Sequence, residues 1–101
     1  MNEITIDELH AKMENKETYH HIDVRQPEEF EASRIDGAKL IPLGDLPSRL
    51  SEIENLKEEF LVVSCKSGGR SSRALMLLEE QGFKNVWNLV GGNDAWQAKY
   101  K

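Results

Sequence analysis

The pattern of this sequence predicts one α/β domain, residues 1–101, whose mainly parallel sheet is covered by helices on both faces. Apolar stretches with the character of strands, at 19–23, 37–42, 60–64 and 86–89, alternate with short amphipathic helical segments. Parallel neighbouring strands need a crossover connection, which such helices supply. The length of 101 residues suits one hydrophobic core and is too short for two.

Composition and charge narrow the classes of function. Hydrophobic residues make up 39% and charged residues 31%, as in globular rather than disordered chains. The formal net charge is −5 and no basic stripe exists, which argues against a nucleic-acid partner. The stretch 60–84 is locally basic, which fits a small anionic substrate. A single cysteine excludes an internal disulfide. No apolar stretch approaches the ~20 residues that span a bilayer, and no signal peptide is evident. We therefore expect a cytoplasmic protein without a membrane partner.

Local sequence signals, at helix ends or along one helical face, predict the first three helices. Thr5 and Glu8 form a capping-box pattern that begins a helix reaching Met13. Pro27 suits the first turn of a second helix, because its missing N–H is not needed there. A third helix is predicted by apolar residues spaced along one helical face: Leu46, Leu50 and Ile53.

Two further helices flank the strand at 86–89. One runs from about Ser71 to a break at Gly82, a residue typical of helix ends. Its inward positions are predicted to be Ala74, Leu75, Leu77 and Leu78. Asn93 is a reasonable N-cap for the last helix.

Cys65 lies where the strand at 60–64 ends and a helix begins. It is followed by glycine, basic and hydroxyl residues: Lys66, Ser67, Gly68, Gly69, Arg70 and Ser71. Backbone N–H groups of such a loop can point inward, and the helix N-terminus adds partial positive charge, so the thiol pKa should lie below its ordinary value of about 8.5. A lone cysteine after an apolar strand is more often a small buried core residue. These neighbours are poor core material, so we interpret Cys65 as a nucleophile.

Charged residues around this loop have distinct expected roles. Lys66 would attract an anionic donor as a point charge, and Arg70 would either brace the loop or bind donor oxygens. Asp23 and Arg25, at the end of the strand at 19–23, are interpreted as an ion pair that fixes the neighbouring loop. The alternative, in which Asp23 holds loop groups near the cysteine, stays open.

No metal or organic cofactor is indicated. His20 and His21 are adjacent in a strand and point to opposite faces, so they cannot chelate one metal ion. His10 is expected on the surface of the first helix. Trp87 and Trp96 are interpreted as packing residues.

Four motifs in this order resemble a single-domain rhodanese, a sulfurtransferase module, over nearly the whole chain. They are Asp23-Val24-Arg25 with Glu28-Glu29-Phe30, Gly37-Ala38 with Ile41-Pro42, the run Cys65 to Arg70 followed by Ser71, and Gly82-Phe83 with Val86, Gly91-Gly92 and Trp96. The resemblance implies a five-stranded parallel sheet. It also implies a persulfide on Cys65, whose sulfur is held by residues 66–71, comes from a thiosulfate-like donor and goes to a thiol, a protein acceptor or cyanide.

Arg34 departs from the family pattern, which commonly has histidine at this point of the motif before Gly37-Ala38. The nucleophile loop is intact, so we expect this change to tune the site and not to abolish activity.

Two other classes of function remain as alternatives. A noncatalytic docking or sulfur-relay module for a partner protein is one, since without a second cysteine any persulfide sulfur must go to another molecule. A cysteine-dependent phosphatase is the other, but those loops resemble Cys-x5-Arg, whereas four residues separate Cys65 from Arg70. The smaller ring suits one sulfur better than a tetrahedral phosphate.

Overall fold

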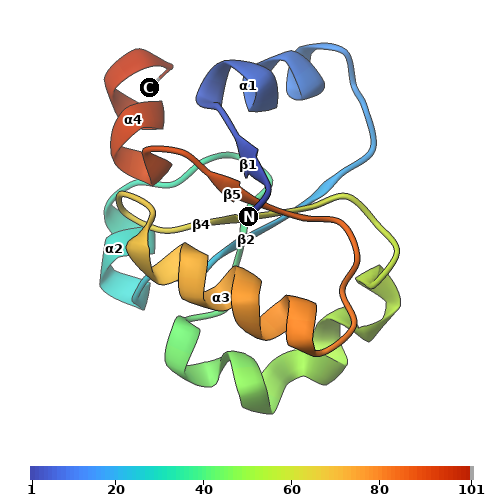
Figure 1. Cartoon of the computed structure of the whole chain (residues 1–101). Coiled ribbons are helices and arrows are strands. Elements are labelled where there is room, and N and C mark those ends of the chain that lie inside the picture. Colours follow the sequence, from blue (N-terminus) through green and yellow to red (C-terminus); the bar gives the residue numbers. More distant parts are fainter. Residues whose placement is uncertain (101) are drawn as a thin grey trace.

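A computed structural model describes residues 1–100 and shows one parallel sheet between two layers of helices (Figure 1). The strands are β1 (Glu3–Ile4), β2 (His20–Asp23), β3 (Lys39–Leu40), β4 (Leu61–Ser64) and β5 (Val86–Leu89). Their order in the sheet is β1-β5-β4-β2-β3, and every neighbouring pair is parallel. The predicted α/β class and the five-stranded parallel sheet are confirmed.

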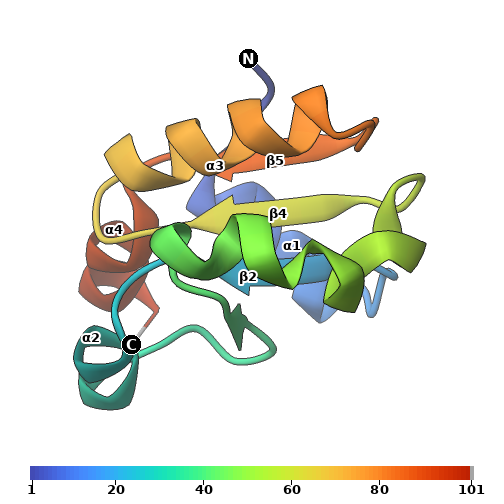
Figure 2. The same ribbon diagram turned by 90° about the horizontal axis from the view of Figure 1, so that it is seen from below.

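The helices divide between the two faces of the sheet. They are α1 (Ile6–Glu14), α2 (Pro27–Ala32), the 3-10 helix η1 (Leu43–Leu56), α3 (Gly69–Glu80) and α4 (Gly92–Lys99). In Figure 1, α1 and α4 lie above the strands, and α3 and η1 lie below them. In Figure 2 the β2 and β4 arrows point toward the end of the molecule that carries α2 and α4. Ligands of parallel sheets bind at this carboxyl edge. Within residues 1–100, no helix is long and apolar enough to cross a lipid bilayer.

A separate hydrophobic core lies on each face of the sheet. The core beneath α3 and η1 includes Ile22, Val63, Leu75 and Leu78, and the core beneath α1 and α4 includes Val62. Every residue of β4 is buried because this central strand is covered on both sides, which explains its continuous apolar run. Of the inward positions predicted for α3, Ala74, Leu75 and Leu78 are buried and Leu77 is half-buried.

The structure corrects two expectations about strands. The sequence pattern does not predict β1, because two residues are too few to show alternation. This strand is defined by its pairing with β5, in which Ile4 lies opposite Leu89. The strand predicted at 37–42 is reduced to Lys39–Leu40 at the sheet edge, where only β2 is available as a partner.

Three helix assignments also change. The third helix has 3-10 geometry, with Pro47 inside it and a non-helical residue at Ile53. α3 begins at Gly69, two residues before the predicted start. Gly91, with φ +79°, caps α4, and the predicted cap Asn93 lies within the helix. The predicted first cap at Thr5, Pro27 at the start of α2 and the break at Gly82 are confirmed.

Candidate active site

The cysteine loop, defined as residues 65–71, leaves the middle strand of the sheet. Cys65 follows directly after β4, and Gly68, with φ +128°, turns the chain into α3. A positive φ of this kind is accessible to glycine at little cost. Cys65 is only 1% exposed and is not part of a disulfide. The topology therefore places a buried thiol at the carboxyl edge of the sheet, beside a helix N-terminus.

Hydrogen-bond donors surround the Cys65 sulfur. The Gly68 backbone N–H donates to Sγ at 3.0 Å, and the Ser71 hydroxyl oxygen lies 3.3 Å from Sγ. Burial raises the pKa of Cys65, but the Ser71 hydroxyl and the backbone N–H groups of Ser71, Gly68 and Ser67 outweigh it, so the pKa lies below its ordinary value. Of the loop amides expected around the sulfur, the Gly68 N–H makes a direct hydrogen bond to it.

Alkylation of Cys65 by iodoacetamide should follow a pH profile with a midpoint below that of an ordinary thiol, about 8.5, because the thiolate is stabilised in the loop. Ser71→Ala removes one donor and should move the midpoint to higher pH. The rate of intact-mass change between pH 5 and 10 measures both profiles. A wild-type midpoint at or above that of a free thiol would contradict the stabilised thiolate.

Asn88 connects Ser71 to β5. Its Oδ1 lies 2.5 Å from the Ser71 hydroxyl oxygen, and its Nδ2 donates to Ser72 Oγ at 3.2 Å. Asn88 is buried within a strand, a position where asparagine is uncommon. Sequence analysis missed this residue, although a polar residue inside a predicted buried strand was the available signal.

The N-terminus of α4 anchors the beginning of the cysteine loop. The Asn93 N–H donates to the Cys65 carbonyl at 2.8 Å, and the Asp94 N–H donates to the Lys66 carbonyl at 3.0 Å. Both carbonyl groups therefore face α4, which leaves the following N–H groups of the loop available to the sulfur. Gly92 makes this approach possible: its φ is +58°, and a Cβ there would lie 2.4 Å from the Cys65 carbonyl oxygen.

Gly92→Ala should destabilise the domain and disturb the loop together. The left-handed conformation costs a residue with a Cβ roughly 1–2 kcal/mol, and the clash with two backbone carbonyls adds to it, so we expect a loss of about 2 kcal/mol or more. The thermal midpoint should fall by roughly 10 °C. Gly44→Ala is the matched control, because no atom lies within 4 Å of its added Cβ and its φ is not positive. Equal midpoints for the two variants would contradict this role.

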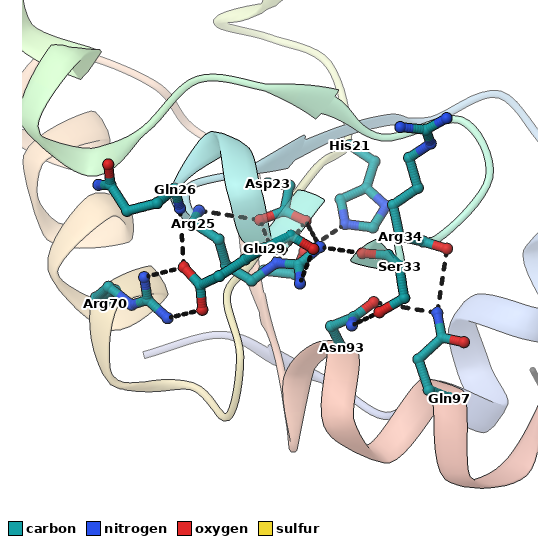
Figure 3. Close-up of polar contacts among 11 residues, drawn as sticks. His21, Asp23, Arg25, Gln26, Glu29, Ser33, Arg34, Arg70, Asn93 and Gln97 are labelled. Carbon is teal, nitrogen blue, oxygen red and sulfur yellow. Dashed lines mark hydrogen bonds and ion pairs between the residues drawn. The ribbon is translucent and has the colours of Figure 1, made fainter. Parts of the chain in front are cut away.

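Asp23 and Arg25 form the ion pair expected from the sequence. The Arg25 Nη2 lies 2.7 Å from Asp23 Oδ2, and the two side chains are 3% and 2% exposed. The remaining Arg25 N–H groups donate to the backbone carbonyls of Glu29, at 3.2 Å, and Ser33, at 2.8 Å (Figure 3). The pair thus fastens the end of β2 to the middle of α2 and to the residue that follows it, which agrees with the interpretation of Asp23 and Arg25 as an ion pair that fixes the neighbouring loop.

Arg70 binds the carboxylate of Glu29, a residue that was not among the site residues predicted from the sequence. Its two terminal nitrogens donate to the two oxygens of Glu29 at 2.8 and 3.0 Å (Figure 3). The hydrogen bonds from Arg70, and next the Gln26 backbone N–H, lower the pKa of Glu29 to about 2. Of the two roles expected for Arg70, the structure displays the bracing contact, between the cysteine loop and α2. The signal for Glu29 was its place in the motif with Phe30.

Lys66, Ser67 and Gly69 lie on the exposed side of the loop. The Lys66 ammonium pairs with Asp94 of α4 at 3.0 Å. Arg34, which takes the place of the usual family histidine, positions its guanidinium 4.9 Å above the Phe30 ring. Its contact is therefore with α2, and its backbone carbonyl accepts a hydrogen bond from Gln97 of α4 at 3.1 Å.

The two adjacent histidines lie in different environments, as their alternation in β2 predicts. His21 is buried, with Nε2 2.7 Å from the hydroxyl of Ser64, the residue before Cys65. Burial lowers the pKa of His21 to about 4, so the imidazole is neutral at pH 7. His20 is half-exposed, with Nε2 3.8 Å from a Glu59 carboxylate oxygen.

Comparisons with known proteins agree with this architecture. The rhodanese-like domain family matches residues 5–99. A sulfurtransferase of Allochromatium vinosum is 36% identical over 96 residues, covering 95% of this chain and 88% of that protein. A crystal structure of a rhodanese-like domain protein from Staphylococcus aureus superimposes with a TM-score of 0.87 at 35% identity, covering 95% of this chain and 91% of the other.

The Bacillus subtilis protein YrkF is also similar, at 36% identity over 97 residues, or 96% of this chain, but the chain spans only 51% of its length. The match over residues 5–99 shows that this chain belongs to the rhodanese-like domain family, whose members similar to it include sulfurtransferases.

Proposed function

We propose that this protein moves a sulfane sulfur from a small donor such as thiosulfate to a thiol or to cyanide, through a persulfide on Cys65. The observation that carries the proposal is the donor set around Sγ, with the Gly68 N–H at 3.0 Å and the Ser71 hydroxyl at 3.3 Å. These groups stabilise negative charge on sulfur, as an oxyanion hole does on oxygen. Family membership supports the class of reaction.

The reaction divides into two displacements at sulfur. The Cys65 thiolate attacks the outer sulfur of thiosulfate, so that a new S–S bond forms, the old one breaks, and sulfite leaves with the electron pair. A thiolate or cyanide then attacks the terminal sulfur, and Cys65 leaves as a thiolate. The covalent intermediate replaces one difficult transfer by two easier ones.

The loop donors have a role in both steps. In the first, they hold the thiolate before attack. In the second, they stabilise the charge that returns to Sγ as the outer sulfur departs. Arg70 contributes by fixing the loop against α2 through Glu29, and the α4 N–H groups fix its other end.

The acceptor in a cell is proposed to be a thiol on another molecule, including a partner protein. Cys65 is the only cysteine of the chain, so the sulfur cannot pass to a second thiol within it. A reducing compartment such as the cytoplasm suits this chemistry, because it keeps a lone reactive thiol reduced.

Intact-mass measurement after separate incubation with thiosulfate and 3-mercaptopyruvate tests the proposal. We expect the mass of one sulfur atom to be added and the adduct to map to Cys65. Aryl phosphates should be hydrolysed negligibly, because the four residues between Cys65 and Arg70 form a ring too small for phosphate. Inserting one glycine between Gly68 and Gly69 should weaken sulfur transfer. Phosphatase turnover by the wild type, lost in Cys65→Ser, would show that loop length does not decide the chemistry.

A further inference from the structure

Both cations of the cysteine loop are neutralised by carboxylates from other elements. Arg70 is held by Glu29 of α2, and Lys66 Nζ lies 3.0 Å from Asp94 Oδ2 of α4. The positive charge that the sequence places beside Cys65 is therefore balanced within the fold before any donor arrives.

Asp94 and Glu29 differ in how much else depends on them. Glu29 makes a bidentate contact and accepts a hydrogen bond from the Gln26 N–H at the start of α2. The Asp94 side chain is 53% exposed and that of Lys66 is 61% exposed, so neither fills the core. The Asp94 backbone N–H also donates to the Lys66 carbonyl, which fixes its carboxylate beside the residue that follows the nucleophile.

We propose that Asp94 is a specificity-determining residue that disfavours anionic sulfur donors at Cys65 relative to uncharged ones. It acts by cancelling the charge of Lys66 at the side of the loop where that lysine would otherwise attract an anion. The consequence for sulfur transfer rests on the proposed function, whereas the effect on the charge near Cys65 does not.

Alkylation of Cys65 measures this charge without sulfur chemistry. With iodoacetate or iodoacetamide, an Sγ–C bond forms, the C–I bond breaks, and iodide leaves with the electron pair. One reagent is an anion and the other is neutral, so the ratio of their rate constants reports the local potential, and changes in thiolate fraction cancel. In Asp94→Asn the iodoacetate-to-iodoacetamide ratio should rise about twofold to threefold at about 0.01 M ionic strength and return toward wild type at about 1 M.

Three further variants isolate the Lys66–Asp94 pair. Glu58→Gln is the control, because it changes the net charge by the same amount. Glu58 pairs with Lys84, both side chains are 70% exposed, and Glu58 precedes β4, at the edge of the sheet opposite Cys65. The alkylation ratio of this variant should therefore match that of the wild type. Lys66→Gln should lower the ratio, because the Asp94 charge is then unbalanced. The double variant Lys66→Gln/Asp94→Asn should restore it, which closes a double-mutant cycle.

Thiosulfate carries two negative charges, so its KM in Asp94→Asn should fall about fourfold to tenfold at low ionic strength, with a smaller change in kcat. An unchanged alkylation ratio in Asp94→Asn, or an equal rise in Glu58→Gln, would overturn the role of Asp94. A raised ratio without persulfide formation from any donor would instead overturn the sulfurtransferase function and leave the charge assignment intact.

Discussion

Cys65→Ser should lose sulfur transfer by about a thousandfold or more while the domain stays folded. The serine hydroxyl remains protonated at neutral pH, so the donors that stabilise a thiolate in this loop have no anion to bind. The exchange of sulfur for oxygen removes little volume from a buried site, so the loss of stability should be within about 1 kcal/mol.

Mass measurement after thiosulfate treatment checks the first part of this prediction, and thermal unfolding checks the second. Wild-type protein that is loaded and then treated with cyanide serves as the control, because it should lose the added sulfur and return to its original mass. Sulfur transfer retained by Cys65→Ser would remove the nucleophile from the mechanism.

Of the single substitutions proposed for this protein, Asp23→Asn should lower the free energy of unfolding most, by about 3–5 kcal/mol. The Arg25 guanidinium is 3% exposed, and without Asp23 it would be a buried charge with no counterion. Because Asp23 lies opposite Ser64 in the β2–β4 register, next to the nucleophile, sulfur transfer should fall as well.

Urea denaturation measures the free energy of unfolding for this prediction. Glu58→Gln is the control, because its exposed pair with Lys84 contributes little and the denaturation midpoint should not change. The double variant Asp23→Leu/Arg25→Met should recover stability relative to Asp23→Asn, since it removes the unpaired charge. A loss below about 1 kcal/mol in Asp23→Asn would show that the buried pair is not needed.

Local patterns in the sequence predict the fold class and the position of the thiol correctly because the relevant signals are adjacent residues. A continuous apolar strand followed by a glycine-rich turn and a helix start is a local feature, and it places Cys65 at the carboxyl edge of the sheet. The cap at Thr5 and the helix start at Pro27 are local in the same sense, because each concerns hydrogen bonding within one helical turn.

The strand at the sheet edge and the cap of the last helix are less visible in the sequence. β1 consists of two residues, so its identity depends on the β5 backbone beside it. Asn93 is a residue type that is favoured at N-caps, but Gly91 and Gly92 adopt positive φ values, and α4 starts before Asn93. Close approach to the Cys65 carbonyl requires this earlier turn, and that contact exists only in the folded domain.

The sequence by itself determined the class of the fold and the position of the thiol between a buried strand and a helix start. Tertiary structure alone decided which charges that loop presents: Glu29 is 41 positions from Arg70, and Asp94 is 28 positions from Lys66. Short-range periodicity carries no information about such pairs. They form because α2 and α4 are brought to the same end of the sheet, and the resulting carboxylates turn an apparently basic loop into a balanced one.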